Sequence, residues 1–232
     1  MKTKKPIITE LLNELHSGYS DNKAPLHKQD IYFILPIANQ AIELEKGIDK
    51  MVLDKNFICA ASLTRSLLEC SLVLAYALSF HELNKEIEEE EFFDKFLENG
   101  RMQKYYKKRW RNVRDIDLLD VFNILFHIDI QSDYDSLCNI LHYSKSHITL
   151  PIKSMEGGKF QVNIGYNKSF VNVTEEQQDW IVRIKKLMID TICFNIAAEI
   201  NGRRMYNEIE VSKVAMAAQS YWISEYGTRK SN

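Results

Sequence analysis

Glycine and proline are scarce in this chain, which has 8 Gly and 4 Pro among 232 residues. Because these residues mark most turns, their scarcity favours long helices and disfavours an all-β fold. A large net charge is also missing, since 30 Lys and Arg oppose 32 Asp and Glu and give a formal charge of −2 at pH 7. With no general positive field to attract nucleic acid, binding of that kind would require a local basic surface.

Cysteine pairs and metal motifs are absent from the sequence as well. The four cysteines form no C-x-x-C pair and lie in apolar segments of helical pattern, where a reduced cysteine acts as a small hydrophobe; they are Cys59, Cys70, Cys138 and Cys193. Since there is no HExxH motif and no Cys/His cluster, we predict neither a metal ion nor another cofactor. The N-terminal segment has charged residues where an export signal requires an apolar core, which predicts a cytoplasmic protein.

The chain does have one long apolar run, Phe57 to Phe80, and this run contains two charged residues, Arg65 and Glu69. It is long enough to cross a bilayer. Each charge near the centre of a spanning helix costs about 2.5 to 3.5 kcal/mol, however, and no long Leu/Ile tract compensates for it. We therefore predict a buried helix of a soluble protein and no membrane partner.

The hydrophobic periodicity predicts an all-α, multi-helix bundle in a single domain that comprises residues 1–232. Pro36 lies near the start of the second expected helix and should kink or interrupt its first turns. Apart from a helix that contains the long apolar run, the expected helices cover residues 7–16, 28–55, 115–128, 132–147, 174–201 and 206–226.

Capping residues predict where three of these helices begin. Asn56 is a suitable N-cap for the helix that contains the apolar run. Ser132 with Asp135, and Thr174 with Gln177, have the spacing of a capping box. These pairs place the starts of the two helices that follow them.

Two further segments predict interruptions of the helical pattern. Near residues 150–173 the chain has Pro151, a Gly-Gly pair and the alternating sequence KFQVNIGY, which predict a loop or a small β-hairpin insert. The sequence NGRR at residues 201–204 predicts a helix stop followed by two surface charges.

Two neighbouring blocks of opposite charge form the strongest local charge feature. Glutamates at residues 86–91 predict an exposed acidic helix that stops at Asn99-Gly100, and RMQKYYKKRWRNVR follows at residues 101–114. In the basic block, cations can pair with phosphates while Tyr and Trp rings stack on unpaired bases. An alternative is a solvated face that the acidic block screens. The first interpretation predicts RNA binding by Arg101, Lys104, Tyr105, Tyr106, Lys107, Lys108, Arg109, Trp110 and Arg111.

The two charges in the apolar run are four residues apart, so on a helix Arg65 and Glu69 share a face and can touch. Their apolar surroundings predict partial burial, where an unpaired ion is very costly. They form either a structural ion pair between packed helices, or part of a cleft in which Arg65 faces an anionic group. His142 is the candidate third partner, because a histidine can act as general base or acid near neutral pH.

The motifs AASLTRSLLECSLVLAYAL and YDSLCNILHYSKS resemble uncharacterised bacterial and phage-associated all-helical families. These families are distantly similar to HEPN-type helical bundles, whose active members are metal-independent ribonucleases among toxin and antiviral proteins. The resemblance implies a HEPN-like effector of bacterial or phage conflict, a homodimer and a protein partner from the same operon. Carried over by position, it places the catalytic centre at Arg65, Glu69, Tyr134 and His142.

The chain departs from the catalytic HEPN signature, because no arginine has a histidine four to six residues downstream. Ribonuclease activity therefore requires that Arg65 and His142 rebuild this pair across two helices. His142 would then transfer the proton, Arg65 would stabilise the charge on the phosphate, and Glu69 would orient either group. The alternative is a non-catalytic helical binding protein, antitoxin-like or a complex subunit, in which Arg65 and Glu69 are structural.

Overall fold

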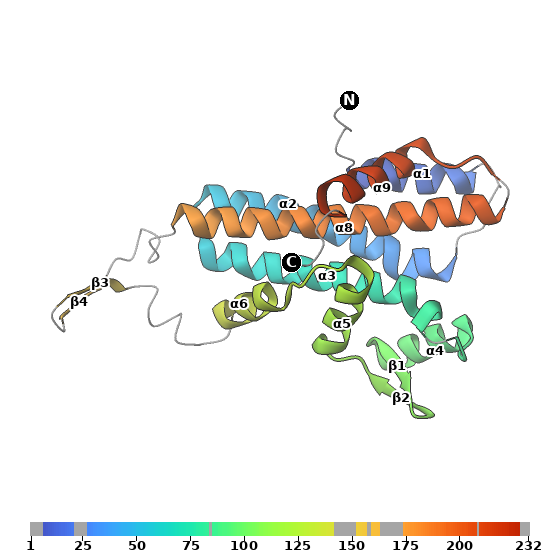
Figure 1. Cartoon of the computed structure of the whole chain (residues 1–232), viewed down its shortest axis with the longest axis horizontal. Coiled ribbons are helices and arrows are strands. Elements are labelled where there is room, and N and C mark those ends of the chain that lie inside the picture. The colour runs from blue at the N-terminus through green and yellow to red at the C-terminus, as the bar shows by residue number, and fades with distance from the viewer. Residues whose placement is uncertain are drawn as a thin grey trace. The chain divides into compact units, whose positions relative to one another are not determined.

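The computed structural model describes residues 7–20, 27–83, 85–141, 152–156, 159–162, 174–207 and 209–227. In this part the chain consists mainly of α-helices and has two short antiparallel hairpins (Figure 1). The predicted all-α multi-helix bundle with a small hairpin insert is therefore confirmed. The helices are α1 (Ile8–Ser20), α2 (Leu35–Leu53), α3 (Phe57–Leu83), α4 (Glu89–Asn99), α5 (Asp115–Phe126), α6 (Gln131–Leu141), α8 (Glu175–Tyr206) and α9 (Lys213–Tyr226).

The chain forms two compact units. Unit 1 comprises Met1–Asn39, Cys70–Asp129 and Ile189–Asn232, and unit 2 comprises Gln40–Glu69 and Ile130–Met188. Three helices, α2, α3 and α8, each contribute residues to both units. The single domain expected for residues 1–232 stays a prediction.

A π-helical turn, Asp30–Ile34, precedes α2 and explains how the helix tolerates Pro36. Proline has no N–H to donate, and its ring conflicts with the carbonyl four residues earlier. A π turn widens the helix at this point and accommodates the ring. The predicted interruption of the first helical turns is thus confirmed. Helix α1 extends to Ser20, a turn beyond the expected end at residue 16.

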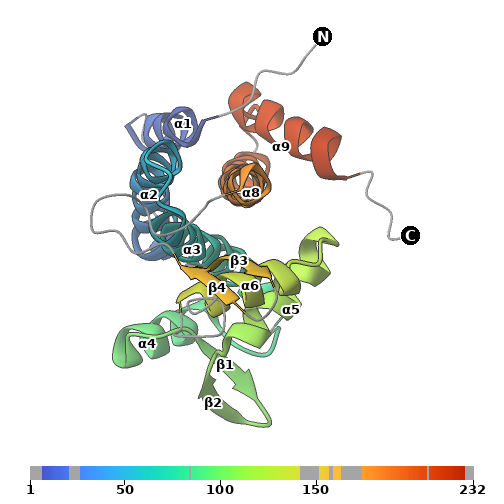
Figure 2. The ribbon, with the colours of Figure 1, turned by 90° about the vertical axis from the view of Figure 1, so that its left-hand side faces the viewer.

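Unit 1 has an aromatic core to which α3, α4 and the π-helical turn contribute. Phe33, Phe80, Phe92 and Phe93 are almost fully buried, and the rings of Phe80 and Phe92 stack with their centroids 3.9 Å apart. Helix α4 ends as predicted at Gly100, whose φ of 62° is the left-handed conformation that glycine adopts most readily. The hairpin of β1 (Gln103–Tyr106) and β2 (Arg109–Asn112) follows and lies beside α4 (Figure 2).

The predicted helix stop at residues 201–204 is wrong, because α8 continues through this sequence to Tyr206. Asn201 accepts a hydrogen bond from the backbone N–H of Ser212 and donates one to Gln219, so its side chain holds the start of α9. Arg203, which was expected on the surface, has a side chain only 11% exposed and is ion-paired with Asp30.

Unit 2 contains the first part of α3, α6 and the first part of α8. Asn56 caps α3 as predicted, since its side chain accepts from the N–H of Cys59. Thr174 and Gln177 form the expected reciprocal capping box at the start of α8. The predicted box at Ser132 is wrong, because α6 already begins at Gln131 and Ser132 lies inside its first turn.

The predicted hairpin insert near residues 150–173 is present as β3 (Ile152–Glu156) paired with β4 (Lys159–Val162). The two strands are antiparallel, and the register shifts between Ile152 and Ser154. The remaining residues of the insert lie outside the described part of the chain.

Within the described residues, one helical stretch, Phe57–Phe80, is long and apolar enough to cross a membrane. However, 61% of its most apolar window is buried inside the fold. This extent of burial is consistent with a core helix of a soluble protein.

Candidate functional site

The charged pair of the apolar run lies on α3 in unit 2, where Arg65 is buried and Glu69 is exposed. The side chain of Arg65 is 7% exposed, whereas that of Glu69 is 53% exposed. The neighbouring residues Leu67 and Leu68 are fully buried. The pair therefore reaches solvent through the carboxylate of Glu69 rather than through the guanidinium.

Helix α6 supplies the other partners of the guanidinium, and we call the four residues the arginine cluster: Arg65, Glu69, Tyr134 and Cys138. Nη1 lies 2.7 Å from the Glu69 carboxylate, and Nη2 donates to the Tyr134 hydroxyl at 2.5 Å. Nε donates to the Cys138 sulfur at 3.2 Å, while Cζ lies 4.0 Å from the centre of the Tyr134 ring. Within unit 2, Nε and Nη2 of Arg65 thus each donate a hydrogen bond, and Nη1 is at ion-pair distance from Glu69.

The electrostatics of the cluster keep Arg65 charged. Burial alone would lower the pKa of Arg65, but the hydrogen bond to Cys138 and the negative charge of Glu69 outweigh burial, and the pKa is raised. An incoming phosphate would have to displace the Glu69 carboxylate to reach this guanidinium. The buried guanidinium thus connects α3 to α6 and faces solvent only through Glu69; we call such a group an interhelical pin.

Three of the four residues predicted for the catalytic centre are in contact: Arg65, Glu69 and Tyr134. The fourth, His142, lies outside the described residues and directly follows the last residue of α6, so its pairing with Arg65 stays a prediction. Cys138 was not predicted as a partner of Arg65. The sequence feature that could have indicated it is its spacing of four from Tyr134, which places both side chains on one face of α6.

The basic block forms the hairpin β1–β2 of unit 1, although no strand was predicted there. Its strands pair Lys104 with Arg111 and Tyr106 with Arg109 across a two-residue loop. Side chains alternate between the faces of a strand, so these four residues share one face of the hairpin. We call this the outer face.

The opposite, inner face packs against the helices of unit 1. The Trp110 ring stacks on Phe80 with centroids 6.2 Å apart, and its Nε1–H donates to Glu91 at 3.0 Å. Gln103 is buried, and its carbonyl accepts from the Tyr76 hydroxyl. Tyr105 meets Trp110 edge to face. Tyr105 and Trp110, two of the three aromatic residues of the block, are therefore half-buried and attach the hairpin to the helices.

Tyr106 lies on the outer face, close to two cations. The residue is 48% exposed, and the Lys107 Nζ and the Arg111 Cζ lie 5.3 and 5.6 Å from the centre of its ring. Among the described residues, no carboxylate pairs with Lys107, Lys108, Arg109 or Arg111. The acidic block contacts Trp110 and Lys28 but neutralises none of these four cations.

The loop of the hairpin consists of two lysines in a left-handed conformation that lysine rarely adopts. Lys107 and Lys108 have φ values of 50° and 60°, as both central residues of a type I′ turn require. Asn-Gly is the favoured pair at such a turn, since the left-handed region costs other residues about 1 to 2 kcal/mol. Two lysines are therefore held here at the expense of local stability.

The remaining basic residues of the block differ in their availability. Lys104 is ion-paired with Asp117 at 2.6 Å, and Arg114 also reaches this carboxylate. Burial would raise the pKa of Asp117, but the hydrogen bonds from Lys104 and the Arg114 backbone outweigh burial and lower the pKa. Arg101 is exposed. Lys104 is thus neutralised locally, whereas Arg101, Lys107, Lys108, Arg109 and Arg111 are exposed.

No group of three His, Cys, Asp or Glu residues in the described part of the chain could hold a metal ion. Comparisons with protein-family models, curated proteins and solved structures find no match. The HEPN-like relationship therefore stays a prediction that depends on the two quoted motifs.

Proposed function

We propose that this chain is a helical RNA-binding protein that holds single-stranded RNA on the outer face and loop of hairpin β1–β2. Arg65 and Glu69 serve its fold in this proposal, which corresponds to the non-catalytic, antitoxin-like or complex-forming alternative. The observation that carries it is the exposed ring of Tyr106, with Lys107 and Arg111 close to it, on a hairpin whose four cations Lys107, Lys108, Arg109 and Arg111 have no acidic partner among the described residues.

The chemistry of the hairpin favours a single strand over a duplex. An exposed aromatic ring offers a stacking surface to a base, and a base is free to stack only when it is unpaired. Lys107 and Arg111 lie over the Tyr106 ring, so they move aside when a base stacks there and can then pair with its neighbouring phosphates. The strained Lys-Lys loop agrees with this role, because strained backbone is retained most often at functional sites.

The double variant Lys107→Asn/Lys108→Gly separates RNA binding from stability. Asn-Gly fits the type I′ turn, so the variant is expected to melt at the same temperature as the natural protein or higher. Its affinity for a labelled single-stranded oligoribonucleotide should fall. Removing two phosphate contacts should also reduce the slope of log K against log salt by about 1.4. Fluorescence anisotropy across a salt series measures both quantities.

A matched control removes two lysines elsewhere. Lys46→Gln/Lys50→Gln, on the exposed side of α2, changes the net charge equally and should leave RNA affinity nearly unchanged. Equal affinity losses in the two double variants would show that the hairpin has no special role. Tyr106→Ala should weaken binding by about 1 to 3 kcal/mol if its ring stacks on a base.

A HEPN-like metal-independent ribonuclease is the second candidate function, and one observation favours it. Arg65, one of the four residues named by the resemblance, contacts two of the others, Glu69 and Tyr134. A histidine beside them could take the proton of the RNA 2′-hydroxyl, while the guanidinium stabilises the charged phosphate.

This second function predicts cleavage of labelled RNA in the presence of a chelator, and its loss on His142→Ala. General acid–base catalysis contributes about 10² to 10⁴-fold to rate, so the variant should be slower by that factor without a change in melting temperature. Gel analysis of the products measures the effect. Failure of the natural protein to cleave RNA, while it still binds RNA, would exclude the ribonuclease and leave the binding function intact.

A further inference from the structure

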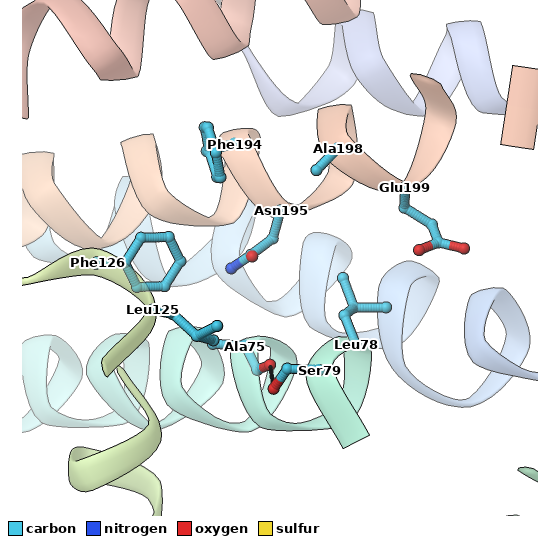
Figure 3. Close-up of a pocket in the computed structure, with 9 residues that line it drawn as sticks. All are labelled: Ala75, Leu78, Ser79, Leu125, Phe126, Phe194, Asn195, Ala198 and Glu199. Atoms are coloured by element: carbon cyan, nitrogen blue, oxygen red, sulfur yellow. Dashed lines mark hydrogen bonds between the residues drawn. The ribbon is translucent and has the colours of Figure 1, made fainter. Parts of the chain in front are cut away.

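A cavity of about 330 Å³ lies in unit 1 between α3, α5 and α8, partly open to solvent (Figure 3). Its volume is within the range of small-molecule sites. Six of the nine lining residues are apolar, with Phe126 and Phe194 at one end, and polar groups come from Ser79, Asn195 and Glu199. The two phenylalanine rings meet edge to face with centroids 5.9 Å apart. Such a site suits a small ligand with an apolar body and few polar groups.

Asn195 is the unusual residue of this cavity. It is 8% exposed, and its Nδ2 is buried with no hydrogen-bond partner among the described residues. Figure 3 shows its side chain pointing from α8 into the cavity, toward α3. A buried donor without an acceptor destabilises a fold, and native structures contain few of them. An acceptor on a bound molecule would supply the missing partner.

The other polar groups restrict the charge of that molecule. Ser79 donates its hydroxyl hydrogen to the Ala75 carbonyl at 2.7 Å, so its oxygen lone pairs are left to accept. Among the described residues that line the cavity, Glu199 is the charged one, and it shares Arg203 with the buried carboxylate of Asp30. A phosphate or carboxylate group is therefore disfavoured at this site.

We propose that the cavity binds a small, neutral heteroaromatic ring of the nucleobase class. The amide of Asn195 presents a donor beside an acceptor, which is the pattern that pairs with the N7 and the 6-amino group of adenine. The apolar walls and the rings of Phe126 and Phe194 suit the flat body of such a ligand. This inference goes beyond the proposed RNA binding and does not depend on it.

Calorimetric titration of the full chain with free adenine, cytosine, uracil and benzene tests the proposal. Adenine is expected to bind saturably and more tightly than benzene, which has the apolar body but no polar edge. Asn195→Leu should weaken adenine binding about tenfold or more, because the paired edge is lost. The same substitution should raise Tm of the ligand-free protein by about 2 to 4 °C, because an unpartnered buried donor is removed.

A second variant keeps the test decisive if Asn195→Leu does not fold. Ala198→Leu narrows the cavity from α8 and keeps the amide, and it should also weaken adenine binding. The hairpin variant Lys107→Asn/Lys108→Gly should retain it, which separates this site from the RNA surface. The proposal is overturned if none of the three bases binds, if benzene binds as tightly as adenine, or if adenine binds Asn195→Leu and Ala198→Leu as well as it binds the natural protein.

Discussion

Replacing Arg203 with methionine is expected to lower the free energy of unfolding by about 3 to 5 kcal/mol at neutral pH. Its partner Asp30 is fully buried, and the two side chains are 2.5 Å apart. Asp30 also accepts from the backbone N–H of His27 at the start of the π-helical turn. Without Arg203 its carboxylate would be left in the core of unit 1 without its guanidinium partner. Urea denaturation followed by circular dichroism measures the loss.

The adjacent arginine provides a matched control. Arg204 pairs with Glu14, and both side chains are 24% exposed, so water can replace the partner when it is lost. Arg204→Met should therefore destabilise by no more than about 1 kcal/mol. The double variant Asp30→Asn/Arg203→Met should be more stable than Arg203→Met alone, since no charge is left buried. Similar losses for Arg203→Met and Arg204→Met would contradict a buried ion pair.

The position of Arg203 also shows why sequence patterns failed at the end of α8. Asn-Gly followed by two arginines is typical of a helix stop at the surface, and local propensity favours that interpretation. The helix continues because Asn201 bonds to Ser212 and Arg203 to Asp30, a residue 173 positions earlier in the chain. Neither partner can be found from the neighbouring sequence. Tertiary contacts decided this boundary.

Predictions that depended on nearby residues were more successful. The caps at Asn56 and Thr174, the stop at Gly100 and the interruption by Pro36 all involve groups within a few positions of each other. Hairpin β1–β2 was missed because its loop has Lys-Lys where a turn signal requires Asn or Gly. Asn195 was missed because nothing in a helical pattern distinguishes a donor that lacks a partner.

The arginine cluster lies between these cases. The spacing of Arg65 and Glu69 predicted their ion pair, and burial of the apolar run predicted that further partners were needed. Tyr134 was predicted from the family resemblance, whereas Cys138 was identified only in the structure. Neither segment alone shows which residues of α3 and α6 face each other in unit 2. What the contact geometry adds is that the guanidinium links α3 to Tyr134 and Cys138 of α6.

Removing Arg65 is the second large effect that we expect. Arg65→Ala loses the ring contact and hydrogen bond to Tyr134 and the hydrogen bond to Cys138, and leaves a void at a site only 7% exposed. A loss of about 2 to 4 kcal/mol in unfolding free energy follows from these contacts together. Arg65→Lys should recover little of it, since one ammonium group cannot reproduce a planar fork with three different partners. Chemical denaturation of both variants gives the values.

Glu69→Gln is the contrasting variant within the same cluster. The carboxylate is 53% exposed, and glutamine keeps an oxygen that can accept from Nη1, so a loss below about 1 kcal/mol is expected. A large loss at Arg65 beside a small one at Glu69 would identify the guanidinium as an interhelical pin. If Arg65→Lys is instead as stable as the natural protein, and has lost RNA cleavage while His142→Ala has lost it too, the structural role is refuted and Arg65 belongs to a catalytic centre.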